Sequence, residues 1–550
     1  MCMFILCILI TITPLTRLAS TTLLSSVPLF MLLTVVGTKL PTDLHLTANV
    51  YASQVNTDTI EFLSIMLLVF LLYALSVYLV QKHIVTATPS TLTGKLLQEH
   101  TIRRILQIIW IGAVLIGVIY VLAPVMLSRD IAAYASYGRI IVVYHANPYY
   151  TVPAAFPNDP ILQASDWQGV VTAYGPIWLA ACAISTLIAG NSMLHYILFY
   201  RILGLAVHLV NIGLVTTILR KMGYPPRTVV TGTVLYAWNP LVLLESCMSG
   251  HNDTAMVTCI LLGVFLCLHA EHDNFRYTRS YLPPLLAFMC AALIKFTAAP
   301  IIVFYLVLLA RRVFINSSSI QRQGLWARWW LVLRPITGVA LVSILVSGVL
   351  YAPLWAGHTP QEIAASLASP PASRLAFGSI LLALQKVAAL HQLDAHFLFL
   401  SLHSTWNIIN AVVVFSLCAI GAIWLWRIPT TQTVVQAMLA TLGALLVVTP
   451  WFFPWYVVWL VGLAAVSVPI HRGYLVRALV ASISVFSASA LLIYLFRGYP
   501  PVGDWIGFTS LTTIGPPLAI FLFLLLPRKN TVRIHTNGPD TVETANQLVP

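Results

Sequence analysis

Long apolar segments almost free of charge run through most of this chain and constrain its fold more than any other feature. Many approach or exceed about 20 residues, the length that a helix needs to cross the hydrocarbon core of a bilayer. They are continuous rather than alternating, which favours helices over the strands of a membrane barrel. Only 8% of the 550 residues are charged, whereas a soluble domain carries about 25%. The sequence therefore predicts an all-α, polytopic transmembrane bundle of about 12–15 spans.

The expected spans share an apolar centre and polar or proline-containing boundaries. They are expected at residues 20–38, 61–81, 104–125, 195–219, 228–247, 254–270, 332–355, 405–426, 432–449, 454–470, 476–496 and 505–527. Residues 282–311 suit a hairpin of two short helices that breaks near Lys295 and Pro300. Residues 175–190 form a shorter run, which we expect to be a re-entrant or interfacial helix.

The positive charges predict the orientation of the chain. The net charge is +13, and the Lys and Arg residues lie in short connections, which the positive-inside rule assigns to the cytoplasm. Two long segments, 129–172 and 357–405, then lie on the opposite side. Within the second, residues 377–390 could lie flat on the membrane. The polar machinery is thus expected on the extracytoplasmic side of a cell membrane.

The first candidate cluster begins with RDIAAYASYGR, from Arg129 to Arg139. Asp130 follows an apolar helix, where a carboxylate can accept a proton or bind a cation. Tyr134 and Tyr137 have the spacing of one helix face. In the alternative interpretation, Asp130 caps a helix and the aromatic residues belong to the membrane interface. The HANPYY and AYGPIW sequences that follow add polar and aromatic candidates, namely Asn147, Tyr149 and Tyr174.

The second cluster is WNPLVLLESCMSGHND, which ends at Asp253. Glu245 lies in or near an apolar span, where an ionisable side chain costs roughly 2.5–3.5 kcal/mol and is a functional candidate by default. His251 and Asn252 crowd a tight external turn with Asp253. The alternative is a hairpin turn in which Asp253 caps the next helix.

Two further segments carry candidates. Lys295 stands in AALIKFTAAP on the expected external side, where it could meet a phosphate or extend its ammonium group toward water. The sequence TPWFFPWYVVW, from Thr449 to Trp459, is either an aromatic belt at the interface or a platform for sugar faces. Trp455 is its main candidate.

Several motifs of other protein classes are missing. The chain has no Walker loop, GxSxG or HExxH motif, and no attached nucleotide-binding domain. Its eight cysteines lie in or beside apolar runs without a CxxC pair, which indicates membrane packing rather than disulfides or metal ligands. A nucleotide-driven pump or an enzyme with its own nucleotide-sugar domain is therefore disfavoured.

The ordered set of motifs resembles a known family. An Asp after an early span is followed by the Tyr/Asn-Pro-Tyr loop, YGP, NPL…E…GHND, the IKFT lysine hairpin and a late PW-rich segment. Over residues 121–459 this is similar to the polyprenol-phosphate-sugar glycosyltransferases of superfamily C, most of all to bacterial mannosyltransferases that use polyprenyl-phosphate-mannose. The resemblance implies a many-helix bundle with its active site in the first large external loop, and an acidic catalytic residue that maps onto Asp130.

The chain as a whole is expected to divide into three parts. Residues 1–103 would be N-terminal membrane helices, 104–527 the glycosyltransferase transmembrane domain, and 528–550 a disordered cytoplasmic tail. A lone Arg-Asp stands where a double-acid DxD pattern would support a metal, so a divalent cation (Mg²⁺ or Mn²⁺) is the one cofactor that is left open.

The expected reaction moves a hexose, with mannose as the first candidate, from a polyprenyl-phosphate donor in the bilayer to a lipid-linked or cell-envelope glycan. Asp130 would be the base of an inverting single displacement. Cations would stabilise the leaving phosphate, and the candidates are Arg129, Arg139 and Lys295. No nucleic-acid partner is expected. The expected substrate-binding residues are Tyr134, Tyr137, Asn147, Tyr149, Tyr174, Glu245, His251, Asn252, Asp253 and Trp455.

Two other functions are compatible with these residues. A secondary transporter would use Glu245 and Lys295 in its transport path, but it usually shows inverted repeats, which are not evident in this sequence. A lipid-linked glycan polymerase or ligase is also an external glycosyl transferase, and the sequence distinguishes it poorly.

Overall fold

A computed structural model describes residues 57–83, 92–123, 127–275, 278–317, 325–368, 376–390, 395–467, 474–496 and 509–526. Within these ranges the regular structure is helical, and the β-type pairing is one isolated bridge between Phe377 and Trp451. The predicted all-α bundle is therefore confirmed. The expected span at 20–38 and the tail from residue 528 lie outside the described residues.

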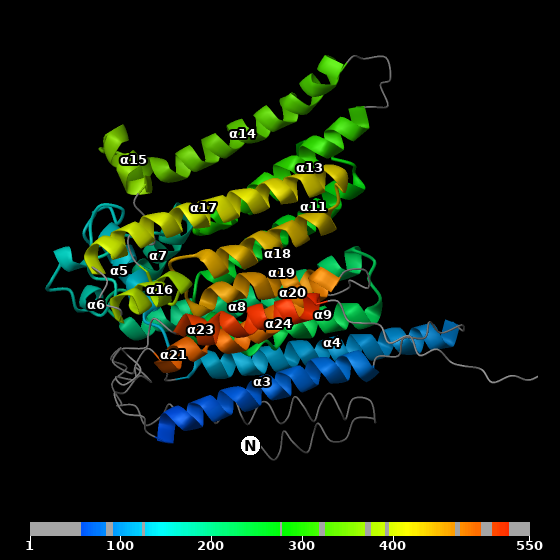
Figure 1. Ribbon diagram of the computed structural model, residues 1–550, viewed down its shortest axis with the longest axis horizontal. Coiled ribbons are helices and arrows are strands. Elements are labelled where there is room, and N and C mark those ends of the chain that lie inside the picture. Colours follow the sequence, from blue (N-terminus) through cyan, green and yellow to red (C-terminus); the bar gives the residue numbers. More distant parts are fainter. Residues whose placement is uncertain are drawn as a thin grey trace, which may run out of the picture.

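Long antiparallel helices form the body of the molecule (Figure 1). In the part of the chain that is described, eight helices are long and apolar enough to cross a membrane, and five shorter apolar helices accompany them. The long helices are α4 (Leu92–Val121), α8 (Met193–Lys221), α11 (Asp253–His272), α13 (Ala299–Ser317), α14 (Leu325–Trp355), α17 (Ala395–Arg427), α18 (Thr431–Val448) and α20 (Tyr474–Ala490). The shorter apolar stretches include Met66–Val80 within α3 (Thr57–His83), and the helices α12 (Thr278–Ile294), α19 (Val457–Ser467) and α24 (Gly515–Leu525). Helix α4 runs across residue 103, where the sequence suggested a domain boundary.

The span expected over residues 228–247 is broken, which corrects the sequence prediction. Helix α9 (Pro226–Ala237) ends before Asn239, and a short helix α10 (Pro240–Leu243) leads into the π-helical turn η3 (Leu244–Met248). Pro240 lacks the amide hydrogen that would continue the helix. The Asn239 side chain instead caps the new helix by accepting from the Val242 amide at 3.2 Å. The break turns the chain so that Glu245 faces the interior.

The hairpin expected over residues 282–311 breaks at Lys295, as predicted. Helix α12 ends at Ile294, and the 3-10 turn η4 (Phe296–Ala298) precedes α13. Pro300 does not lie at the break but in the first turn of α13. The first turn of a helix tolerates a residue without an amide hydrogen, so Pro300 does not interrupt α13.

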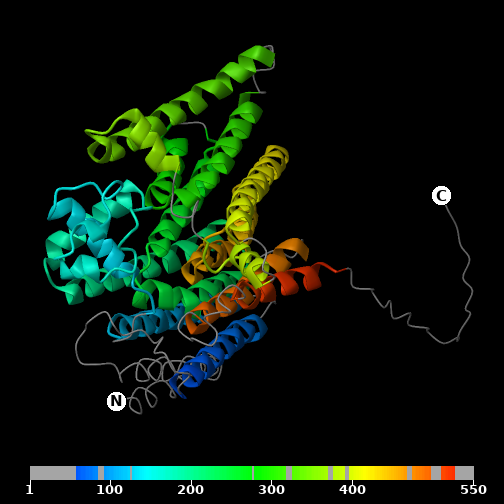
Figure 2. The same ribbon diagram turned by 60° about the vertical axis from the view of Figure 1, so that its left-hand side comes forward.

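Short helices gather at one end of the bundle, on the left in Figure 1, and Figure 2 brings this end forward. They come from the two segments expected outside the cell and from the run expected to be re-entrant: α5 (Asp130–Val142), η2 (Pro153–Ala155), α6 (Pro160–Gln163), α7 (Pro176–Ala189), α15 (Pro360–Ala368) and α16 (Ile380–Leu390). The remaining short elements are η6 (Pro454–Tyr456), α21 (Leu492–Phe496) and α23 (Thr509–Thr513). The described connection between α8 and α9, residues 222–225, lies at the opposite end of the bundle.

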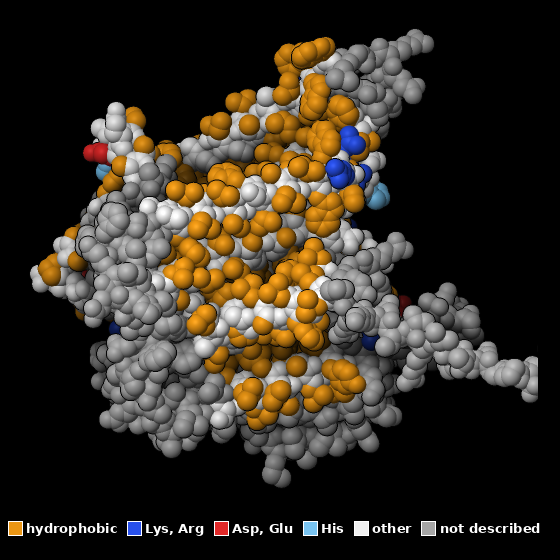
Figure 3. All heavy atoms as spheres, viewed as in Figure 1, with side chains coloured by type: hydrophobic (Ala, Val, Ile, Leu, Met, Phe, Trp, Pro, Cys, Tyr) orange, Lys and Arg blue, Asp and Glu red, His pale blue; other side chains and the backbone are white. Residues whose placement is uncertain are grey.

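Apolar side chains cover the middle of the bundle surface (Figure 3). Helix α14 has only 6% of its span buried against the rest of the molecule, and α17 only 11%. Side chains such as Leu341 and Phe415 are exposed by 66% and 74%. Water would penalise such a surface, and lipid would not, because lipid tails are as apolar as these side chains.

Two glycines allow backbones to touch beneath the site. A Cβ atom at Gly138 of α5 would lie 2.1 Å from the Cys182 carbonyl oxygen of α7, and one at Gly204 of α8 would lie 1.8 Å from the Ser246 carbonyl oxygen of η3. Small residues at helix contacts are the usual means of close packing in membranes. These contacts fix α5 on α7 and the Glu245 turn on α8.

Candidate active site

A pocket at this end of the bundle brings together residues that are far apart in the sequence. Asp130 and Lys295 both line it, and half of its lining residues are aromatic. The aromatic lining residues are Tyr137, Trp167, Tyr174, Phe296, Trp451, Phe453, Trp455, Tyr456 and Trp459. Five predicted site residues thus face one pocket: Asp130, Tyr137, Tyr174, Lys295 and Trp455.

Asp130 is the first residue of α5, and its carboxylate is directed into the pocket region rather than used as a helix cap. The N-cap position belongs to Arg129, which makes no side-chain cap bond. Asp130 Oδ1 accepts a hydrogen bond from the Trp167 indole at 3.0 Å. Oδ2 lies 3.7 Å from His251 Nδ1. The positive end of the helix dipole favours the charged carboxylate here.

Lys295 is paired inside the protein and does not extend to water. Its ammonium group donates to Asp253 Oδ1 at 2.8 Å, and it lies 4.1 Å from the centre of the Tyr456 ring. The Trp459 indole donates to the same Asp253 oxygen at 2.6 Å. Asp253 Oδ2 is buried without a hydrogen-bond partner among the described residues. The contact with Asp253 excludes the alternative in which Lys295 extends to water. Asp253 does not cap α11, because Asn252 holds the N-cap position of that helix.

His251 stands between two carboxylates. Its Nε2 lies 3.3 Å from Glu245 Oε2, on the side opposite to Asp130. The imidazole stacks on the Trp455 ring at 3.9 Å between centres. Glu245 has no exposed surface, and its Oε1 accepts from the Tyr494 hydroxyl at 2.9 Å. Glu245 and His251 therefore lie behind the pocket wall, within reach of Asp130.

Tyr134 and Asn252 support this wall from inside. The Tyr134 hydroxyl lies 3.5 Å from both Oδ1 and the backbone nitrogen of Asn252. The Tyr134 ring packs edge-on against Tyr174 and Trp178. Tyr134 is fully buried, so it joins α5 to the His251 turn rather than lining the pocket.

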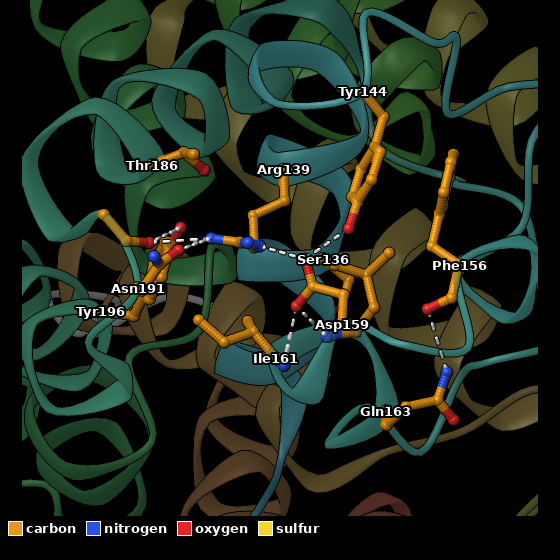
Figure 4. Close-up of polar contacts among 12 residues, drawn as sticks. Ser136, Arg139, Tyr144, Phe156, Asp159, Ile161, Gln163, Thr186, Asn191 and Tyr196 are labelled. Carbon is orange, nitrogen blue, oxygen red and sulfur yellow. Dashed lines mark hydrogen bonds and ion pairs between the residues drawn. The ribbon is translucent and has the colours of Figure 1, made fainter.

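Arg139 lies in the last turn of α5, at the end opposite Asp130, and does not line the pocket. Figure 4 shows its polar contacts. Its guanidinium donates to Asp159 at 2.7 Å, to Asn191 at 2.8 Å and to the Gly190 carbonyl at 2.9 Å. Tyr144 also donates to Asp159, which in turn caps α6. Burial acts to raise the pKa of Asp159, but the bonds from Arg139 and Tyr144 outweigh it and hold the pKa below its ordinary value.

The other predicted loop residues tie the external segment together. Arg129 pairs with Asp166 at 3.2 Å on a partly exposed surface beside Asp130. The Asn147 amide donates to the Leu354 carbonyl at the end of α14, and the Tyr149 hydroxyl donates to the Tyr174 carbonyl at 2.7 Å. Asn147 and Tyr149 thus anchor the loop and do not line the pocket.

Sequence reasoning missed several residues of the site. Trp167, Tyr456 and Trp459 contact the charged groups, although the last two belong to the aromatic segment already noted and Trp459 follows Trp455 by one helical turn. Arg201 of α8 is buried and donates to the carbonyls of Met248 at 2.7 Å and Val121 at 3.2 Å. It holds the start of the His251 turn against the end of α4. Arg201 is a charged residue inside the predicted span 195–219, which is the same signal that marked Glu245, whereas Tyr494 offered no sequence signal.

No group of three or more His, Cys, Asp or Glu side chains suited to a metal ion occurs among the described residues. The divalent cation stays a prediction. The described cysteines form no disulfide, and Cys2 and Cys7 lie outside the described ranges.

The fold and the buried ionisable cluster define a polytopic membrane protein with a polar site at one end of its helical bundle. A family model described as alpha-(1->6)-mannopyranosyltransferase, N-terminal domain, matches residues 23–311. Because this is more than half of the chain, the protein belongs to that family. The match includes Asp130, Glu245, His251, Asp253 and Lys295, whereas the aromatic segment 449–459 lies beyond it.

One curated relative is the alpha-(1->6)-mannopyranosyltransferase A of Corynebacterium glutamicum. It is 26% identical over 149 residues, which are 27% of this chain and 30% of the relative. The matched segment therefore spans less than a third of the relative's length.

Proposed function

We propose that this protein is an integral-membrane mannosyltransferase that moves mannose from a polyprenyl-phosphate donor to a hydroxyl group of a lipid-linked or cell-envelope glycan. The observation that carries the proposal is the pocket in which a carboxylate, Asp130, and an ammonium group, Lys295, share an aromatic wall. Membership of a family named for mannosyl transfer supports mannose as the transferred sugar. It also favours a transferase over a transporter.

The proposed step is a single displacement. The acceptor oxygen bonds to C1 of mannose while the bond from C1 to the phosphate oxygen breaks, and the phosphate leaves with the electron pair. Asp130 takes the proton of the acceptor hydroxyl. The family name specifies an α-(1→6) product. Since one displacement inverts C1, an α-linked product requires a β-linked mannosyl phosphate.

Lys295 is the proposed cation for the leaving phosphate. Its charge is held in the pocket by Asp253 and by the rings of Tyr456 and Trp459. Charge that develops on a leaving group is stabilised best by groups already fixed in place. Arg129 lies at the rim, beside Asp130. We assign Arg139 a structural role, because its guanidinium donates hydrogen bonds to Asp159, Asn191 and Gly190.

The test of the donor uses purified protein in lipid nanodiscs. Polyprenyl-phosphate-mannose or GDP-mannose, each radiolabelled in the sugar, is offered with a mannosylated glycolipid acceptor. We expect transfer from the lipid donor alone, in a linkage that an α-1,6-mannosidase removes. Transfer from GDP-mannose alone would refute the proposed donor. Asp130→Asn is the inactive control, and Asp166→Asn, in the same external segment, is the matched active control.

The side of the membrane is tested separately. Asn158 is exposed at the pocket end, and Lys221 is exposed at the opposite end. We expect an impermeant thiol reagent to label Asn158→Cys in intact cells and to label Lys221→Cys only after permeabilisation. The reverse pattern would place the pocket in the cytoplasm. The described native cysteines are buried or half-buried and serve as the background.

A further inference from the structure

Three buried polar atoms behind the pocket have no hydrogen bond among the described residues. They are Nδ1 and Nε2 of His251 and Oε2 of Glu245. The distance from Nε2 to Oε2 is 3.3 Å, and Nδ1 lies 3.7 Å from Asp130 Oδ2. Buried polar atoms are rarely left unsatisfied, and each exception requires an explanation.

Neither side chain can turn to water for a partner. The His251 ring is stacked on Trp455, and the His251 amide donates to the Glu245 carbonyl at 3.0 Å. The Glu245 side chain has no exposed surface, and its other oxygen is held by Tyr494. The Ser249 hydroxyl also lies beside the Glu245 carboxyl, so the three atoms depend on one another, on Ser249 and on Asp130.

The balance of charges in the cluster requires a proton on Glu245 or His251. Lys295 lies against Asp253 at 2.8 Å, and no Lys or Arg pairs with Glu245 among the described residues. A buried carboxylate without a cation is costly, and such a group commonly takes up a proton instead. The groups that face His251 and Glu245 are Asp130 and Tyr134 from α5, Asp253 from α11, Tyr494 from α21, and Lys295.

We propose that Glu245 and His251 hold one shared proton that keeps Asp130 charged and oriented as the base. The protonated carboxyl of Glu245 donates to Nε2, which fixes the tautomer with the hydrogen on Nδ1, directed at Asp130 Oδ2. Such fixing of the tautomer by the opposite ring nitrogen is common for histidine. The contact of 3.7 Å shortens when substrate fills the pocket, since catalytic hydrogen bonds are often long in an empty site.

This inference rests on the proposed function and changes the role expected from the sequence. Glu245 and His251 are positioning residues that act through Asp130, not residues that touch the sugar. The proton stays within the pair during transfer, and the acceptor proton goes to Asp130.

The test compares two substitutions of Glu245. Glu245→Gln keeps the shape of the protonated acid, and its amide can still donate to Nε2. We expect it to retain about a third or more of the turnover. Glu245→Leu leaves Nε2 without a donor, and we expect a loss of at least about tenfold in kcat with a donor KM within about twofold. Turnover of the wild type should fall at high pH as the shared proton is lost, and Glu245→Gln should not show this fall.

Controls separate this inference from folding and from the proposed function. His208→Gln changes another fully buried histidine, bonded to the Ala237 carbonyl at 3.2 Å and outside the pocket lining, and should keep full turnover. Thermal stability of each variant in detergent reports folding. Infrared spectra in nanodiscs should show the carbonyl band of a protonated carboxylic acid that Glu245→Gln removes, whether or not any donor is turned over.

Three results would overturn the inference. The first is a folded Glu245→Gln variant as slow as Glu245→Leu, which would mean that Glu245 works as an anion. The second is a Glu245→Leu variant with wild-type kcat. The third is the absence of the infrared band from the wild type at neutral pH. If the band is present and no mannosyl transfer occurs, the proposed function fails and the protonated pair stands.

Discussion

The two ends of helix α5 carry buried charge clusters that differ in how completely they are satisfied. At the Arg139 end, the guanidinium and the Asp159 carboxylate have close partners on loops and neighbouring helices. At the Asp130 end, atoms of His251, Glu245 and Asp253 are buried without hydrogen bonds in the described structure. The comparison teaches that burial of charge does not by itself identify a site. Only the cluster whose Asp130 and Lys295 line a pocket has room to receive a substrate.

The largest effect is expected from Asp130→Asn, which keeps the shape of the side chain and an oxygen that can accept from Trp167. We expect turnover to fall by at least about 10²-fold, the low end for loss of a general base. Donor affinity and thermal stability should change little. Asp166→Asn, in the same segment, is the control. A loss of turnover smaller than about tenfold would show that a residue other than Asp130 is the base.

The next effect concerns Lys295. Lys295→Met leaves Asp253 as a buried carboxylate without its cation, which should cost about 3–5 kcal/mol of stability. Adding Asp253→Asn should restore most of the stability, because the unpaired charge is gone. Donor KM should stay raised by roughly 10- to 150-fold in the double variant, since a charge-assisted bond to the phosphate is missing. Recovery of normal donor kinetics in the double variant would show that Lys295 serves only to neutralise Asp253.

At the Arg139 end of α5 we expect a substitution to lower stability and to leave donor binding unchanged. Arg139→Met breaks the pair with Asp159 and should lower the free energy of unfolding by about 3 kcal/mol. Donor KM measured below the melting temperature should match the wild type. A rise in donor KM with stability intact would return Arg139 to the list of phosphate ligands.

The smallest effect is a pH dependence of stability at the same end. The pKa of Asp159 is lowered from 3.8 in the folded protein, so its pair with Arg139 stabilises the fold fully above that ordinary value. The contribution is lost as the pH falls through the lowered pKa. The difference in melting temperature between wild type and Asp159→Asn should therefore be constant near neutral pH and shrink below about pH 4. A difference that shrinks already between pH 7 and 5 would argue against this pair as its source.

The sequence predicted the helical class and most spans, because lipid imposes length and apolarity on each helix independently of the others. It also placed Asp130, Lys295 and Trp455 in one site. It did not distinguish Arg139 from Lys295, since both are basic residues near external segments and only their partners differ. Those partners, Asp159 and Asp253, are 20 and 42 residues away along the chain. The π-helical turn and the contact between Glu245 and Tyr494 depend on tertiary packing and leave no periodic pattern.

The π-helical turn at Leu244–Met248 has a consequence for how this chain tolerates insertions and deletions. An α-helix advances by about 100° per residue, and a π turn accommodates one residue more than an α-helical turn does. The angular phase of His251 and Asp253 relative to Pro240 therefore depends on that single extra residue. Removing one residue from this turn would let it close as an α-helix and rotate the side chains that follow away from Asp130. The length of the loop around Asn158 does not determine the orientation of His251 or Asp253. Insertions and deletions in relatives should therefore accumulate in that loop and be absent between Pro240 and Asp253.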